Sequence, residues 1–103
     1  MPNYGNLMAR STHHRHYQSL LKLLRDLREQ AGMTQSELGE RLGNTQTFVS
    51  KIERGERRLD VVEFAEICDA LGADPKVAFG QFMDGRVKER TGRKVASSRT
   101  QRR

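Results

Sequence analysis

The fold of this chain is decided by residues 34–58, TQSELGERLGNTQTFVSKIERGERR. The opening letters TQSE form a capping box, in which two side chains satisfy backbone N–H groups at the start of a helix. Gly43 then supplies the backbone conformation of a sharp turn, and Thr45 can cap a second helix. The stretch therefore predicts two short helices, at 35–42 and 46–54, with a tight connection between them.

A glycine in the first of these helices indicates how the two pack. Gly39 lies in the middle of that helix, where glycine is less favourable than alanine by about 0.5–1 kcal/mol. The absence of a side chain makes sense if the second helix crosses closely over the first. A close crossing after a tight turn is the arrangement of a helix-turn-helix unit.

Helical signals continue on both sides of this unit. Leucines recur at three- and four-residue steps over 17–31, and apolar residues do so over 61–71 and 75–84. A second capping box begins at Asp60, and Asp74 precedes a proline at the first helical position. Glycines that can end a helix follow the five stretches, at positions 32, 43, 55, 72 and 85. We therefore expect an all-α fold of five short helices.

The flanks differ from this middle zone. Residues 1–16 are polar and show no apolar period, which predicts a flexible N-terminal arm. Residues 86–103 contain eight basic side chains and one acid, with too few apolar residues to fold alone. We expect a basic, disordered C-terminal tail there and one domain over 17–85. A length of 103 residues with 35% hydrophobic residues also favours one small domain.

The composition argues against several classes of protein. No apolar run approaches a membrane span, which takes about 20 residues, and no apolar stretch near the start resembles a secretion signal. The single cysteine, Cys68, cannot form an internal disulfide, so we expect a core residue in a cytoplasmic protein. His13, His14 and His16 lack a nearby acid or cysteine, so we expect solvated arm residues, no metal and no cofactor. No set of acids, nucleophile and base points to an enzyme.

Two segments resemble a known family. Residues 27–38, LREQAGMTQSEL, and 48–59, FVSKIERGERRL, are similar to the phage-repressor/Cro-like regulators, also called the xenobiotic-response-element (XRE) family. The resemblance covers about residues 17–83. Gly39 departs from it, because alanine is usual at that position. The resemblance implies a five-helix lambda-repressor-like domain that binds double-stranded DNA sequence-specifically and controls transcription, with repression expected.

In such a fold the helix at 46–54 lies in the major groove, with its first turns against the base edges. The side chains expected to read bases are Gln46, Thr47, Ser50 and Lys51. Glutamine can bond adenine, lysine can reach guanine, and threonine offers a hydroxyl and a methyl group. Phe48 has two interpretations, since it either covers the edge of the core or touches a thymine methyl group.

Phosphate contacts need donors around that groove. The residues expected to provide them are Gln35, Arg54, Arg57 and Arg58. The resemblance implies that Gln35 contacts both phosphate and Gln46. The alternative for the arginines is a solvated loop with surface pairs to Glu53 and Glu56. The resemblance also pairs Arg28 with Glu53 as a partly buried structural ion pair.

The expected partners are duplex DNA and a second copy of the chain. Two recognition helices about 34 Å apart read enough base pairs for specificity, which predicts a homodimer. The candidate dimer residues, which could instead close the core, are Val77, Phe79, Phe82 and Met83. The tail either adds phosphate attraction or has no dedicated role. The alternative function is an antitoxin-like module that binds a partner protein through this tail, and RNA binding is a weaker option.

Overall fold

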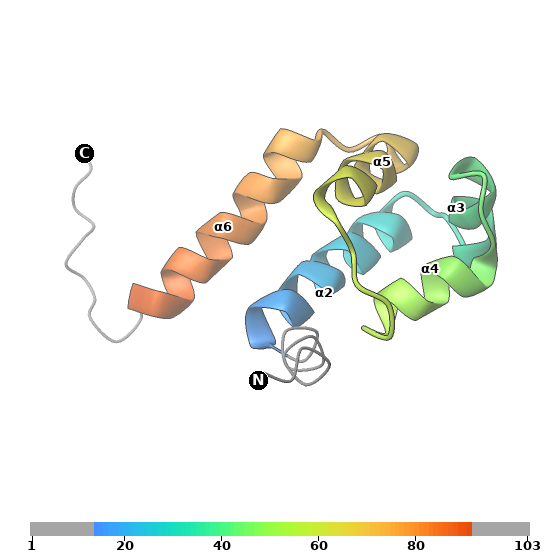
Figure 1. The fold of residues 1–103 in the computed structure, drawn as a ribbon. Helices are drawn as coiled ribbons and strands as arrows, with labels where there is room; N and C mark the ends of the chain where they lie inside the picture. The colour runs from blue at the N-terminus through green and yellow to red at the C-terminus, as the bar shows by residue number, and fades with distance from the viewer. Residues whose placement is uncertain (1–13, 92–103) are drawn as a thin grey trace, which may run out of the picture.

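The computed structural model describes residues 14–91, and Figure 1 shows their arrangement. These residues form five α-helices and contain no β-strand, which confirms the all-α prediction. The helices are α2 (Arg15–Gln30), α3 (Gln35–Arg41), α4 (Gln46–Glu53), α5 (Val61–Leu71) and α6 (Pro75–Thr91). Their bounds lie within two residues of the predicted ones, except at the end of α6.

The helices begin where the capping patterns predict. Thr34 Oγ1 accepts a hydrogen bond from the Glu37 N–H over 3.0 Å, and the Glu37 carboxylate accepts one from the Thr34 N–H over 2.9 Å. Asp60 and Glu63 form a second capping box, with distances of 2.7 and 3.1 Å. The hydroxyl of Thr45 caps α4 by accepting a hydrogen bond from the Phe48 N–H over 3.1 Å. Because these bonds satisfy donors that a helix leaves open, local polar residues fix the starts of three helices.

One predicted helix end is wrong. The predicted stops that adopt a positive φ are Gly32, Gly43, Gly55 and Gly72. Gly85 instead lies inside α6, which continues to Thr91. Glycine within a helix costs only about 1 kcal/mol, and the arginines, lysine and glutamate that follow are good helix formers. Residues 86–91 are therefore helical, and α2 likewise starts inside the predicted arm. The rest of the predicted arm and tail, 1–13 and 92–103, lies outside the described residues.

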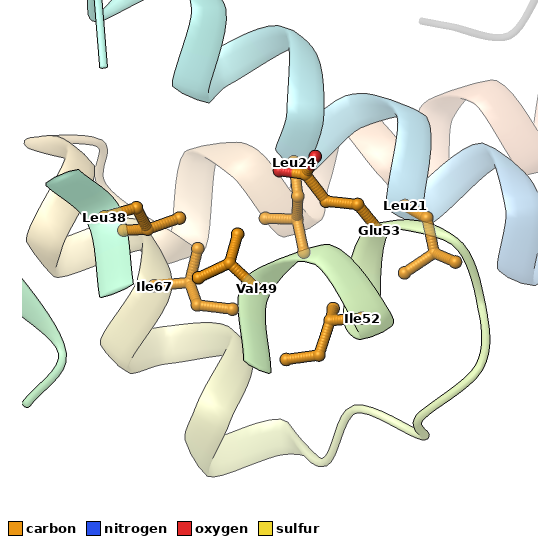
Figure 2. Close-up of a pocket in the computed structure, with 7 residues that line it drawn as sticks. All are labelled: Leu21, Leu24, Leu38, Val49, Ile52, Glu53 and Ile67. Carbon is orange, nitrogen blue, oxygen red and sulfur yellow. The ribbon is translucent and has the colours of Figure 1, made fainter. Parts of the chain in front are cut away.

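The core takes side chains from all five helices. Its buried members are Leu21, Leu24, Leu38, Val49, Ile52, Phe64, Ile67, Cys68 and Ala78. Burial raises the pKa of the Cys68 thiol to about 11, so the sulfur is a neutral core group. Side chains of α2, α3, α4 and α5 surround a space of about 10 Å³ (Figure 2), which holds no more than one water molecule. The two helices of the helix-turn-helix unit, α3 and α4, thus pack against a closely packed apolar core.

Helix α2 lies between the other helices in Figure 1. Helices α3 and α4 pack against each other on one side of it, and α6 packs along α2 and α5 on the other. Phe79 of α6 meets Phe64 of α5 edge to face, with ring centroids 5.9 Å apart. This layout leaves one side of the first two turns of α4 exposed, at Gln46, Thr47 and Lys51. None of the helices in the described range is long and apolar enough to cross a membrane.

Candidate nucleic-acid interface

The two helices of the motif approach each other closely at Gly39. A Cβ atom at this position would lie 2.7 Å from the carbonyl carbon and from the oxygen of Thr45. That is too close for a side chain unless the backbone shifts. The Gly39 carbonyl also accepts a hydrogen bond from the Asn44 N–H over 2.8 Å. The close crossing expected from the sequence is therefore present, and it fixes the angle at which α4 leaves the turn.

Two glutamines join the starts of α3 and α4. Gln46 Nε2 donates to Gln35 Oε1 over 2.7 Å, which is the contact that the resemblance implied between them. Gln35 Nε2 in turn donates to Glu53 Oε1 over 2.8 Å. Because both ends of the Gln35 amide are engaged, Gln46 has a fixed partner at the open end of α4.

The network continues into a shielded ion pair between α2 and α4. Arg28 donates through Nε and Nη2 to the two carboxylate oxygens of Glu53, over 2.7 and 3.1 Å. Its Nη1 donates to the Met33 carbonyl oxygen over 2.7 Å. Both charged side chains are only 10% exposed, and Figure 2 shows Glu53 extending from α4 toward α2. The hydrogen bonds to Glu53 raise the pKa of Arg28. The polar network therefore connects α2, α3 and α4 beneath the exposed side of α4.

Three of the four expected base-reading residues are exposed. Gln46, Thr47 and Lys51 lie on the outward side of α4, in its first two turns. They carry an amide, a hydroxyl with a methyl group, and an ammonium group. Such a set offers donors, an acceptor and an apolar contact to a polar surface.

Ser50 differs from the expectation, because it is buried rather than outward. Its residue exposure is 8%, and its hydroxyl accepts a hydrogen bond from Arg54 Nη1. The helical period does place Ser50 near Gln46, but it also places it beside Glu53, which bonds to Arg28 of α2 and Gln35 of α3. The structure therefore assigns Ser50 to an internal contact with Arg54.

Phe48 covers the edge of the core. Its half-buried ring packs against the core cluster, and the guanidinium of Arg57 lies 4.7 Å from the ring centroid. Of its two interpretations, the structure supports the one in which Phe48 belongs to the core.

Arg54 and Arg57, at the end of α4 and in the loop that follows, are each paired with a carboxylate. Arg54 forms two hydrogen bonds to Glu56, over 2.9 and 3.0 Å, as the alternative interpretation of the loop expected. Arg57 forms two to Glu63, over 2.9 and 2.8 Å. These bonds lower the pKa of Glu56 and of Glu63. Arg58 is exposed, and its backbone carbonyl oxygen accepts a hydrogen bond from Arg57 Nη1 over 2.9 Å.

Glu63 is a contact residue that the sequence reasoning missed. From the sequence alone, Glu63 is the last member of the second capping box. That same box turns the Glu63 carboxylate back toward the residues before α5. The sequence signal for this contact is Arg57, a basic residue six positions before Glu63. The spacing alone does not predict the pair, because the contact depends on the path of the loop between them.

The predicted dimer residues divide into two groups. Val77 and Phe79 are 57% and 45% exposed, whereas Phe82 and Met83 are half-buried. A groove of about 600 Å³ runs beside Phe79, between the first turns of α5 and α6. Its lining is mostly apolar and includes Leu20, Leu59, Val61, Phe64, Ala65 and Phe79. Val61, which the sequence reasoning did not single out, is 81% exposed.

The described residues hold no set of metal ligands. Among residues 14–91, no group of three or more histidine, cysteine, aspartate or glutamate side chains could bind an ion together. His14 and His16 lie near each other, with ring centroids 5.1 Å apart, and His14 Nδ1 caps α2. His13 lies outside the described residues.

Comparisons with known proteins agree with this geometry. A family model described as a helix-turn-helix domain matches residues 19–78. The solved structure of an XRE-family like protein from Pseudomonas syringae pv. tomato is 46% identical, with a TM-score of 0.69 over 74% of this chain and 93% of that one. The clp gene regulator ClgR from Corynebacterium glutamicum is 28% identical, with a TM-score of 0.57 over 84% of this chain and 96% of that one.

A curated sequence matches over a shorter stretch. An uncharacterized HTH-type transcriptional regulator of Sinorhizobium fredii is 41% identical over 46 residues, which span 45% of this chain and 60% of that protein. The motif, the tight crossing at Gly39 and the matched domain define a helix-turn-helix protein. Within that class, the chain belongs to the XRE-like family of helix-turn-helix regulators.

Proposed function

We propose that this protein is a sequence-specific, double-stranded DNA-binding repressor of transcription that reads the major groove with α4. The observation that carries the proposal is the placement of Gln46, Thr47 and Lys51 on the exposed side of α4, a helix that is bonded to α2 and α3 through Glu53. A helix so presented fits the major groove, which admits one α-helix. The role requires no catalytic residue, metal or cofactor.

The chemistry of Gln46 supports a contact to adenine. Its Nε2 group has two N–H donors, of which one is used by Gln35. The second donor and the Oε1 acceptor remain for adenine N7 and N6, the usual bidentate pair. Lys51 can donate to guanine O6 and N7, and Thr47 can contact a thymine methyl group. The bond to Gln35 keeps the Gln46 amide in one orientation, which reduces the ordering that DNA binding must supply.

Phosphate contacts would come from around these residues. Gln35 is the first residue of α3, and one Nε2 donor remains beside its bond to Glu53. Arg54 and its partner Glu56 have side chains that are 55% and 53% exposed. Such an exposed pair is weak in water, so a phosphate can replace Glu56. We assign Gln35, Arg54 and Arg58 to this role.

We also propose that the protein acts as a homodimer, through the groove between α5 and α6. A two-fold interface uses the same surface on both copies, so the surface must complement itself. Phe79 and Val61 provide exposed apolar surface at the groove. Asp60, the N-cap residue of α5, and Lys76 of α6 also line it. In a two-fold arrangement, Asp60 of each copy can face Lys76 of the other.

Selection of bound duplexes from a random DNA pool tests the function directly. We expect a two-fold symmetric sequence with half-sites about one helical turn apart. The variant Q46A/K51A should lose the preference for this sequence, whereas the matched control Q81A/K22A, which changes the same residue types on α6 and α2, should keep it. Enrichment of no duplex would reject the proposal. A reporter with the selected sequence in its promoter should be less active when the protein is present, and increased activity would reject repression.

A further inference from the structure

The loop between α4 and α5 contains a contact that lies partly outside the helix-turn-helix motif. Arg57 donates through Nη1 and Nη2 to the two carboxylate oxygens of Glu63. The same guanidinium lies over the ring of Phe48. Arg57 therefore contacts α4 through Phe48 and α5 through Glu63.

Backbone contacts complete this connection. Arg57 Nη1 also donates to the carbonyl oxygen of Arg58 over 2.9 Å. The N–H groups of Glu56 and Arg57 donate to the Lys51 carbonyl oxygen, over 2.8 and 3.2 Å. The loop is thus attached to the last turn of α4 by its backbone and to the first turn of α5 by one side chain.

The Arg57–Glu63 pair is more sheltered than the neighbouring Arg54–Glu56 pair. Its side chains are 41% and 22% exposed, and the less exposed of them is Glu63. A planar guanidinium can form two parallel bonds to a carboxylate while its face stacks on an aromatic ring. A lysine in the same place could do neither in this geometry, although it would keep the positive charge.

We propose that Arg57 and Glu63 form a clamp that sets the orientation of α4 against α5, which makes Glu63 a positioning residue for DNA recognition. The proposal rests on the proposed function, and it changes the role expected for Arg57. The carboxylate of Glu63 and the ring of Phe48 occupy this guanidinium from two sides. Arg57 therefore acts through the placement of α4 and not through a phosphate contact.

The salt dependence of binding separates these two roles in the full chain. Each phosphate contact on duplex DNA contributes about 0.9 to the slope of log affinity against log salt concentration. We expect R57Q, R57K and E63Q each to weaken binding to a selected duplex by roughly threefold to tenfold, with an unchanged slope. The double variant R57Q/E63Q should bind no more weakly than R57Q or E63Q alone, because each of these variants loses the same Arg57–Glu63 contact.

E63Q is the sharpest of these variants. Its amide oxygen can still accept the Asp60 N–H bond, because glutamine also serves in a capping box. It removes a negative charge, so simple electrostatics predicts tighter binding to DNA, whereas loss of the clamp predicts weaker binding. The matched control is E66Q, which makes the same charge change at an exposed position of α5 and should bind as the wild type does.

A second measurement needs no DNA. The backbone amide resonances of residues 46–48 should shift together in R57Q, R57K and E63Q, and should stay in place in E66Q. The clamp would be overturned if the resonances stay unchanged and E63Q binds DNA more tightly. In that case R57K should bind with wild-type affinity, and R57Q should show a salt slope reduced by about 0.9. Arg57 would then be a phosphate-binding residue. If the wild type binds no duplex, the proposed function fails, but the resonance shifts still decide whether the clamp exists.

Discussion

Gln46 donates a hydrogen bond to Gln35 over 2.7 Å, and this bond joins the first residue of α4 to the first residue of α3. The exposed amide is therefore supported by the ion pair behind it, because Gln35 is bonded to Glu53 and Glu53 to Arg28. Support of a contacting side chain by buried neighbours is a general requirement for precise recognition. The hydrogen bonds of Glu53 to Arg28 and Gln35 thus contribute both to the stability of the domain and to the geometry of α4.

Removal of one partner of the buried pair should strongly destabilise the fold. R28A leaves the Glu53 carboxylate without its main partner, and we expect the free energy of unfolding to fall by about 3–5 kcal/mol. Urea unfolding followed by circular dichroism measures the change. R25A is the matched control, since Arg25 and Glu29 have side chains that are 61% and 53% exposed, and its loss should be about 0–1 kcal/mol. Equal losses in both variants would contradict the structural role of the Arg28–Glu53 pair.

The tight crossing at Gly39 gives a second prediction. Although alanine favours a helix by about 0.5–1 kcal/mol, a Cβ at this position would meet the backbone of Thr45. Overpacking of this kind typically costs about 1–3 kcal/mol, so we expect G39A to lower the thermal unfolding midpoint. G80A provides the opposite case, because a Cβ there meets nothing within 4 Å. G80A should raise the midpoint, and a rise in G39A as well would show that the turn can adapt.

The response of stability to acid should depend on Glu63. Its pKa is lowered in the folded protein, chiefly by the hydrogen bond from Arg57, from an ordinary value of 4.5. The carboxylate therefore stabilises the fold above pH 4.5, and this contribution is lost as the pH falls through the lower, folded value. Urea midpoints measured between about pH 6 and pH 3 should fall less steeply in E63Q than in the wild type. Parallel curves would be incompatible with the lowered pKa.

The proposed dimer can be tested at the groove. V61E places a charge on a lining residue that is 81% exposed, and we expect the dimer dissociation constant in sedimentation equilibrium to rise at least about tenfold. V87E is the control, because Val87 is exposed on α6 and does not line the groove. A zero-length carbodiimide cross-link should join Lys76 to Asp60 of a second, isotopically labelled copy. A monomer at all concentrations, or cross-links confined to one copy, would reject this interface.

Much of the fold could be predicted because its signals are local. The capping boxes at Thr34 and Asp60 each act within four residues, so they fix helix starts without knowledge of the tertiary structure. The predicted helix end at Gly85 was wrong because it depended on more than local sequence. A glycine marks a helix end only where the chain turns. The residues that follow Gly85 are good helix formers, but they include too few apolar side chains to indicate from the sequence that α6 continues.

The site was less predictable because its contacts join distant residues. Periodicity placed Gln46, Thr47 and Lys51 outward, but it could not show that Arg54 would cover Ser50. The pairing of Arg28 with Glu53 came from the family resemblance, since no spacing in the sequence implies it. The partner of Arg57 depends on the path of a loop, and for that reason Glu63 was missed.

Cys68 provides a built-in probe of whole-molecule opening. It is the single cysteine of the chain, and its side chain is completely enclosed. A water-soluble alkylating reagent can reach this sulfur only when the domain opens, so the labelling rate in native buffer reports the population of open molecules. Intact-mass spectrometry can follow this rate for each variant above with no added tag or dye, and one modified site makes every spectrum unambiguous.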